Sequence, residues 1–275
     1  MKRISLVFAL AFCVVSFLNA QKTDTLTTAS GIKYFLTKKG SGRLIQKGEV
    51  AVWHYKFTLE DGTIIDDSRE KKVTLGEKVP SERIVDGLNE ILLMMHIGDR
   101  GVYIVPPQLG YGQRGLAAQG NFPGIRPNST LVFDIEMMDI KKESMSELLE
   151  TALLGKVSSD TSKPHVEEMI ALYKEHKQKK FVDLYRSDED LNTIGYLLLD
   201  KYPEDALKVF KLNVEEYPAV SNVYDSLGEG YMKLGDFEKA ILNYQKSLEL
   251  DPKNKNAEEA IKKMKAKRAK AVNTM

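Results

Sequence analysis

Residues 50–62 read VAVWHYKFTLEDG, a run of β-branched and aromatic residues that ends in an acidic turn. Residues of this kind favour a strand, which we expect over Val50–Leu59. Glu60-Asp61-Gly62 supplies a turn, and the strand pattern resumes over Thr63–Asp66, so the two stretches predict a hairpin. The fold of this region therefore starts from an antiparallel sheet.

A short helix is indicated downstream, because five apolar residues recur at helical spacing: Ile84, Leu88, Ile91, Leu92 and Met95. Further strands are expected over Gly101–Val105 and Leu131–Ile140. Between them, residues 106–128 hold many glycines and prolines and predict a long irregular loop, a kind of loop that usually serves function. We therefore predict an α+β domain over residues 31–142.

The last third of the chain repeats with a period of about 34 residues, which is typical of helix-turn-helix arrays. In residues 221–254 the signature positions are occupied by Tyr224, Leu227, Gly228, Tyr231, Ala240, Tyr244 and Pro252. A preceding unit over residues 188–220 shows Ile194, Gly195, Leu198, Ala206, Phe210 and Pro218. This pattern resembles the tetratricopeptide repeat family, which implies an all-α, protein-binding domain. We expect it over residues 164–271, with a polar capping helix over 256–270.

The first twenty residues predict a cleaved export leader. Lys2 and Arg3 give a positive start, and the apolar run over Ile4–Leu18 has 15 residues, fewer than the roughly 20 that a membrane-spanning helix needs. Ala20 is a small residue before a cut, so residues 1–20 are expected to be removed. We therefore expect an exported protein, periplasmic or outer-membrane-associated, with no transmembrane segment after removal. An uncleaved membrane anchor and lipid attachment at Cys13 are the alternatives.

Polar stretches separate these parts. Residues 21–30 are rich in Thr and are expected to be a tether. Residues 143–163 are expected to link the two domains, with one short helix over Ser144–Leu154. A further helix is expected over Val166–Lys177, because Pro164 suits a helix start.

Composition excludes several classes of function. The net charge is +1, with 43% hydrophobic and 29% charged residues, which is a normal globular balance without a field that attracts nucleic acid. Cys13 is the only cysteine and lies in the expected leader, so disulfide and thiol chemistry are not expected. The four histidines show no metal-ligand spacing, so we expect neither a metal site nor a cofactor.

Four motifs in a fixed order carry a second resemblance. They are VWHYKFTLEDG at 52–62, IDDSR at 65–69, IVDGL at 84–88, and YG at 111–112 with PNSTLVFDIE at 127–136. Together they resemble the FKBP, or immunophilin, family of peptidyl-prolyl cis-trans isomerases. The resemblance implies a bent antiparallel sheet wrapped around a short helix, with the active site between them.

Such an enzyme needs no reactive group. Rotation about an X–Pro bond has a barrier of about 18–20 kcal/mol, because amide resonance is lost at the top of the barrier. No bond forms or breaks, so the catalyst has only to bind the twisted amide better than the planar one. An apolar pocket with a few polar groups can do this.

The resemblance also implies the residues of the site. The catalytic residues would be Asp66, Tyr111 and Phe133. The substrate-binding residues would be Tyr55, Ile65, Val85, Leu88 and Ile125, with Leu88 as the floor and the backbone N–H of Val85 as a donor to the substrate carbonyl. Two alternatives stay open: Asp66 as a hairpin cap or an ion pair with Arg69, and Tyr111 as a plain loop aromatic.

The sequence departs from the family pattern in five places. Two are insertions, because the stretch Glu77–Glu82 and the loop Gln113–Phe122 are longer than in the minimal form. Leu88 stands where well-known members often have Trp, Ile65 where Phe is common, and the aromatic wall after the IDDSR motif is shortened and ends in Val73. Two functions follow. The first is a prolyl isomerase that assists the folding of exported, proline-containing polypeptides, with repeats that bind a protein partner. The second is a non-catalytic adaptor or chaperone scaffold.

Overall fold

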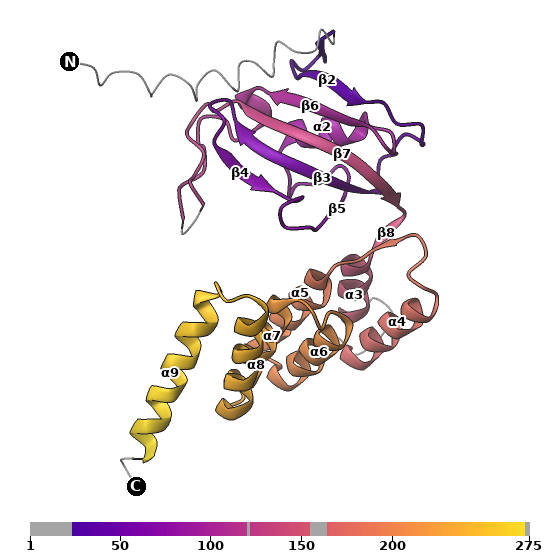
Figure 1. Cartoon of the computed structure of the whole chain (residues 1–275). Helices are drawn as coiled ribbons and strands as arrows, with labels where there is room; N and C mark the ends of the chain where they lie inside the picture. Colours follow the sequence, from indigo (N-terminus) through magenta and orange to yellow (C-terminus); the bar gives the residue numbers. More distant parts are fainter. Residues whose placement is uncertain (1–23, 120–121, 155–163, 273–275) are drawn as a thin grey trace, which may run out of the picture. The chain divides into compact units, whose positions relative to one another are not determined.

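The computed structural model describes residues 24–119, 122–154 and 164–272, with side chains up to 265. The chain divides between Lys142 and Glu143 into two compact units, which Figure 1 shows in sequence colours. The expected leader, residues 1–20, lies outside the described residues. Within them, no helix is long and apolar enough to cross a membrane.

The first unit is built on one antiparallel sheet, which has seven strands in the described part of the chain (Figure 1). Its strands follow the order β1 (Leu26–Thr27), β2 (Lys33–Lys38), β6 (Arg100–Val105), β7 (Leu131–Lys141), β3 (Val50–Leu59) and β4 (Ile64–Asp67), while β5 (Leu75–Lys78) pairs with β3. The central pair is β3 with β7, in register from Val50 opposite Lys141 to Leu59 opposite Leu131. The predicted antiparallel α+β fold is therefore confirmed.

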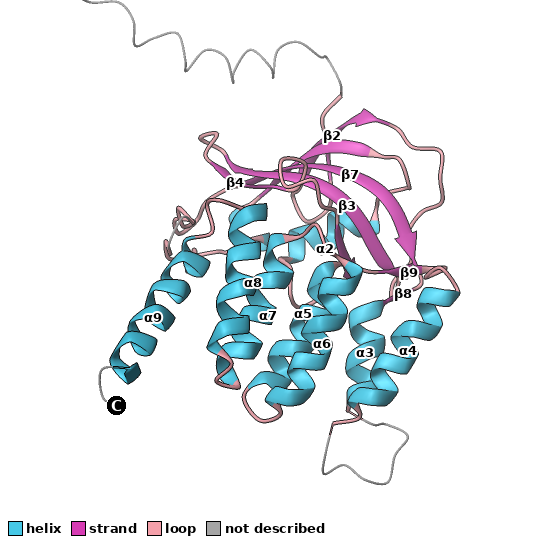
Figure 2. Cartoon of the chain, turned by 60° about the horizontal axis from the view of Figure 1, so that its bottom comes forward, coloured by secondary structure: helices cyan, strands magenta, loops and turns pink. Residues whose placement is uncertain are grey.

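Alternation along β3 decides which side of the sheet becomes the core. Trp53, Tyr55 and Phe57 belong to or pack against the hydrophobic cluster, because successive strand residues point to opposite faces. Helix α2 (Asp86–Leu93) covers this inner face, and its Ile91 and Leu92 are fully buried. Each such side chain contributes roughly 1.5–3 kcal/mol through burial. Figure 2 shows α2 beneath the curved strands.

The strand at the N-terminal edge has no strong sequence signal. Leu26 of β1 pairs with Tyr34 of β2, so the sheet extends into residues 21–30, which the sequence predicts to be a tether. Two residues form too short a pattern to be detected by alternation. Similarly, β2 begins and ends with Lys, and β5 contains Gly, Glu and Lys, which weakens the strand pattern.

The long loop after β6 is folded against the sheet. Leu116 and Ile125 exchange two backbone hydrogen bonds, of 2.7 and 2.8 Å, and Ile125 is buried in the core. Gly115 lies inside this closure with φ +60°, and a Cβ there would lie 2.2 Å from the Ile125 carbonyl oxygen. Only glycine fits such a close approach at positive φ.

The second unit is helical. Its elements are β8 (Glu143–Ser144), α3 (Met145–Leu153), α4 (Val166–Gln178), β9 (Leu184–Tyr185), α5 (Asp188–Leu199), α6 (Pro203–Glu216), α7 (Ser221–Lys233), α8 (Phe237–Leu250) and α9 (Lys255–Val272). Figure 2 shows these helices as a row of antiparallel neighbours. Ala257, Ile261 and Met264 of α9 pack against α8, as a terminal capping helix does.

The expected linker over residues 143–163 differs from the structure in its first part, 143–154, while 155–163 lie outside the described residues. The predicted helix over Ser144–Leu154 is present as α3, but it is part of the helical core, because Met145, Leu149 and Leu153 are buried with α4 and α5. The i, i+4, i+8 spacing of these residues forms one apolar face. Ser144 Oγ accepts a hydrogen bond from the Glu147 N–H and caps the helix. The helical unit therefore begins at Glu143.

Glycines set the distance between the helices of each repeat. A Cβ on Gly195 of α5 would lie 2.2 Å from the Phe210 ring of α6, and a Cβ on Gly228 of α7 would lie 3.1 Å from the Tyr244 ring of α8. Each large ring therefore packs directly on a neighbouring backbone. This close approach explains the small residues of the repeat pattern.

Candidate active site

The polar centre of the predicted site is a contact between two strands. Asp66 on β4 is the Cα partner of Phe57 on β3. The Tyr55 hydroxyl donates to Asp66 Oδ2 at 2.5 Å. Asp66 Oδ1 accepts from the Asp67 N–H at 2.8 Å and lies 2.6 Å from Lys71 Nζ. The carboxylate is therefore held in one orientation on the inner face of the sheet.

These contacts also determine the charge of Asp66. Burial works to raise its pKa, but the hydrogen bonds from Lys71, Tyr55 and the Asp67 backbone outweigh it, so the pKa lies below its ordinary value. Burial, followed by the bond to Asp66, raises the pKa of Tyr55. Tyr55 therefore stays a neutral donor and Asp66 an anion at neutral pH.

The aromatic part of the site is a stacked pair. Phe57 and Phe133 have ring centroids 4.6 Å apart at 18°, and they are 7% and 4% exposed. Phe133 was expected at the site and Phe57 was not. The signal for Phe57 was its place two residues after Tyr55 on the same strand face.

The start of α2 carries Leu88, the expected floor, and Val85, the expected backbone donor. Leu88 is buried in the core cluster. Val85 is the N-cap residue of α2, with φ −65° and ψ 151°. Its carbonyl accepts from the N–H groups of Leu88 at 2.9 Å and Asn89 at 3.1 Å. Its own N–H has no hydrogen-bond partner among the described residues, as expected of a helix start that can receive a ligand.

The loop after β6 contributes the third side. Tyr111 packs half-buried against the core, and burial raises the pKa of its hydroxyl. Tyr55 and Tyr111 pack against the same hydrophobic cluster. Ile125 is buried in the same cluster, and Phe122 packs half-buried against it without having been expected there.

All the apolar and aromatic residues implied by the family resemblance thus gather in or against one cluster, which Ile65 completes. Val73, the end of the shortened wall, is 46% exposed. Leu75 of β5 packs against the cluster. The alternative roles of Asp66 were a cap of the hairpin and an ion pair with Arg69. Asp66 pairs with Lys71, shortly after β4. Arg69 instead lies near Asp134 and Glu136.

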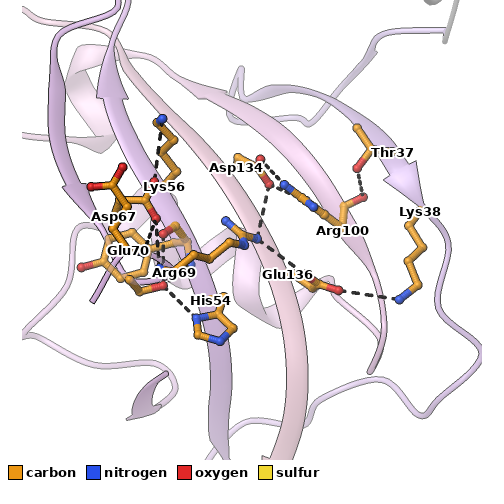
Figure 3. Close-up of polar contacts among 12 residues, drawn as sticks. Thr37, Lys38, His54, Lys56, Asp67, Arg69, Glu70, Arg100, Asp134 and Glu136 are labelled. Carbon is orange, nitrogen blue, oxygen red and sulfur yellow. Dashed lines mark hydrogen bonds and ion pairs between the residues drawn. The ribbon is translucent and has the colours of Figure 1, made fainter. Parts of the chain in front are cut away.

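Those carboxylates belong to the outer face of the sheet, shown in Figure 3. Arg100 Nε and Nη2 donate to the two oxygens of Asp134 at 2.9 and 2.7 Å. Arg69 Nη2 lies 3.6 Å from Asp134 and 3.7 Å from Glu136. His54 is on this face too, with Nδ1 3.0 Å from Ser68 Oγ, as strand alternation predicts. The paired charges of this face are typical of a structural network.

In the described ranges, no group of three or more His, Cys, Asp or Glu residues could hold a metal ion. The inner-face cluster brings apolar side chains together with one anion, two phenol hydroxyls and one N–H that has no partner among the described residues. Such an arrangement can orient an amide and exclude water, but it contains no activated nucleophile.

Comparison with known families shows what kind of domain carries this arrangement. Residues 41–138 match the family of FKBP-type peptidyl-prolyl cis-trans isomerases. They form an FKBP-type domain. All eight predicted site residues fall inside the matched stretch of this FKBP domain. A second match, to the tetratricopeptide repeat, covers residues 221–254, which are α7 and α8.

Relatives share the FKBP domain. The FKBP-type peptidyl-prolyl cis-trans isomerase FkpA of Buchnera aphidicola is 35% identical over 45% of this chain and 46% of its own length. FkpA of Escherichia coli strain K12 is 33% identical over 44% of this chain and 42% of its own. A crystal structure of FkpA from Escherichia coli, 31% identical, covers 48% of this chain and 58% of its own, with a TM-score of 0.39. The chain spans less than half the length of these curated relatives.

Proposed function

We propose that this protein is a peptidyl-prolyl cis-trans isomerase that assists the folding of exported polypeptides, and that its repeats bind a protein partner. The observation that carries the proposal is the gathering of Tyr55, Asp66, Leu88 and Phe133 on one face of an FKBP-type domain. The relatives FkpA are named as isomerases of this type. Proline-containing polypeptides are the substrate class that this family name implies.

The chemistry follows from the residues of the cluster. The proline ring would pack on Phe133 and Leu88, where water is excluded. The Val85 N–H would donate to a substrate carbonyl, which holds the peptide while the X–Pro bond turns. A planar amide is more polar than a twisted one, because resonance separates its charge. An apolar wall therefore disfavours the planar form, while Asp66 and Tyr111 supply polar contacts to the turning amide.

Export is supported by the leader-like residues 1–20. Uncatalysed X–Pro isomerisation takes tens to hundreds of seconds, so acceleration is useful where newly exported chains fold. We place the protein in the periplasm or at an outer membrane. Sequencing the N-terminus of protein from fractionated cells tests this, and a chain that retains residues 1–20 contradicts it.

A specific observation favours the second candidate, a non-catalytic adaptor. Leu88 leaves the floor without an aromatic ring, and Val73 is exposed at the end of the shortened wall. Weaker contacts with the proline ring would leave a domain that binds proline-containing peptides without catalysing their isomerisation.

A protease-coupled assay on Leu-Pro and Phe-Pro peptides separates the two functions. We expect residues 21–275 to accelerate isomerisation in proportion to protein concentration. A folded protein, verified by circular dichroism, that leaves the rate at background refutes the enzyme and supports the adaptor.

A further inference from the structure

The first helices of the two repeat units lie side by side and bring equivalent residues together. The Tyr196 hydroxyl of α5 donates to Glu229 Oε2 of α7 at 2.9 Å. Asn222 Nδ2 of α7 donates to Glu189 Oε1 of α5 at 3.3 Å. The partners in each pair are 33 residues apart. Successive units are therefore stacked in register, and equivalent positions of α5 and α7 share one face.

We call this stripe the acidic face and define it by six residues: Glu189, Asn192, Tyr196, Asn222, Asp225 and Glu229. Three of its members are carboxylates, and the hydrogen-bond donors to them are neutral. Asp225, which is 7% exposed, accepts from Asn254 Nδ2 at 2.9 Å and from Asn256 Nδ2 at 3.0 Å. Amide and phenol donors orient these carboxylates but do not neutralise them.

Several described cations of the helical unit form ion pairs with carboxylates outside the acidic face. Among the side chains that the structure describes, no Lys or Arg forms an ion pair with a carboxylate of the acidic face. Lys208 binds Glu167 and Asp205, and Lys233 binds Asp200 beyond the end of the face. The acidic face therefore presents uncompensated negative charge.

The electrostatics of Glu189 agree with this. Burial raises the pKa of Glu189, and repulsion from Asp188 adds to the effect, which outweighs the hydrogen bond from Asn192. A nearby cation would lower this pKa. Its carboxylate thus lies in a place where a positive charge would be stabilising.

The side-chain amide of Asn192 is a second observation, and it indicates that the acidic face is short of hydrogen-bond donors. Asn192 is 6% exposed, and its Nδ2 donates to Glu189 Oε2 at 3.5 Å. Its Oδ1 is buried without a hydrogen-bond donor in the described part of the chain. A buried acceptor without a partner is costly. This oxygen and the adjoining Glu189 carboxylate are both acceptors, so the described residues supply fewer donors here than these groups can accept.

We propose that the acidic face binds lysine or arginine side chains of a partner polypeptide. The proposal rests on the protein-binding role proposed above for the repeats and makes it specific. Ammonium and guanidinium groups donate hydrogen bonds and accept none, which complements a face of acceptors. Tyr196, 42% exposed, adds a ring on which a cation can stack. The net charge of +1 gives no long-range attraction, so local complementarity selects the partner.

Fluorescence anisotropy with three labelled peptides tests the proposal on residues 21–275. The peptides alternate alanine with lysine, glutamine or glutamate. We expect the lysine peptide to bind, with an affinity that falls as salt is raised, and the other two not to bind. The double variant Glu189→Gln, Glu229→Gln should weaken binding about five- to tenfold. The control variant Glu204→Gln, Glu215→Gln removes the same charge from exposed positions of α6 and should bind as the wild type does.

Each other outcome contradicts the proposal. Failure of the lysine peptide to bind, or equal losses in the two variants, overturns it. Binding of the glutamine peptide alone refutes a basic partner while leaving protein binding by the repeats in place. Self-association of the wild type that the Glu189, Glu229 variant abolishes would make the face an interface between copies. Isomerase activity, measured on the same samples, tests the proposed enzyme separately.

Discussion

Tyr55 and Asp66 come from neighbouring strands and meet through a 2.5 Å hydrogen bond on the inner face of the FKBP domain. This bond joins a neutral phenol to a carboxylate whose pKa is depressed. Charge-assisted hydrogen bonds of this kind are short and about twice as strong as neutral ones. The pair therefore provides a fixed anion beside the apolar residues of the proposed site.

Removing that anion should slow catalysis without unfolding the domain. We expect Asp66→Ala to lower kcat/KM for a Phe-Pro peptide about tenfold, because one charge-assisted contact of roughly 1.5 kcal/mol is lost. Asp139→Ala is the matched control, since Asp139 also binds one lysine and a local N–H. Equal activities of the two variants would show that Asp66 is not part of the site.

The Val85 N–H can be removed with little change to the backbone. Val85 already has φ −65°, the value that proline imposes, and its N–H has no partner in the described structure. We expect Val85→Pro to keep its melting temperature but to lose about three- to tenfold in kcat/KM, the worth of one hydrogen bond. Val85→Ala keeps the N–H and should lose less. A fully active Val85→Pro variant would exclude this N–H as a donor to substrate.

The stack of Phe57 on Phe133 should stabilise the wall of the site. Phe57→Leu keeps most of the buried apolar surface but removes a stacking interaction worth about 0.5–1.5 kcal/mol. We expect urea unfolding, followed by fluorescence of the single Trp53, to show a loss of about 1–2 kcal/mol. Because Phe133 would lose its support, KM should also rise. Unchanged stability together with unchanged KM would contradict a supporting role.

The helical unit should lose stability as pH rises through the titration of Asp190. Burial raises the pKa of Asp190 from 3.8 to about 6. Between these values the folded state holds a proton that the unfolded state releases, so the free energy of unfolding falls as pH rises and then levels off above about 6. Over this pH range the free energy of unfolding falls by at most about 3 kcal/mol.

Thermal melts followed by far-ultraviolet circular dichroism at several pH values measure this effect. Asp190→Asn keeps an oxygen that can accept from the Ser187 N–H, which now binds Asp190 Oδ2 at 2.7 Å. The variant should flatten the dependence on pH. Trp53 fluorescence reports on the sheet domain as an internal control. A variant with the same pH dependence as the wild type would assign the effect to another group.

Much of the fold could be predicted because its signals are local. The predicted strand over Val50–Leu59 is β3, residue for residue, since this stretch is rich in β-branched and aromatic residues and contains no Gly or Pro. β2 and β5 carry only weak strand patterns, and pairing with long neighbouring strands stabilises them. Phe57 and Phe122 were missed for a related reason: their role depends on which residues face them across the sheet and loop.

The sequence by itself determined the family resemblance of the sheet domain and the repeat pattern, because both depend on residue types and their spacing along the chain. The leader is expected from the sequence, and the eight residues expected at the site are implied by the family resemblance. Tertiary structure alone decided that Asp66 binds Tyr55 and Lys71, that α3 belongs to the helical core, and that residues 33 positions apart on α5 and α7 share one face. Those facts depend on which side chains meet after the chain has folded, and local spacing does not contain that information.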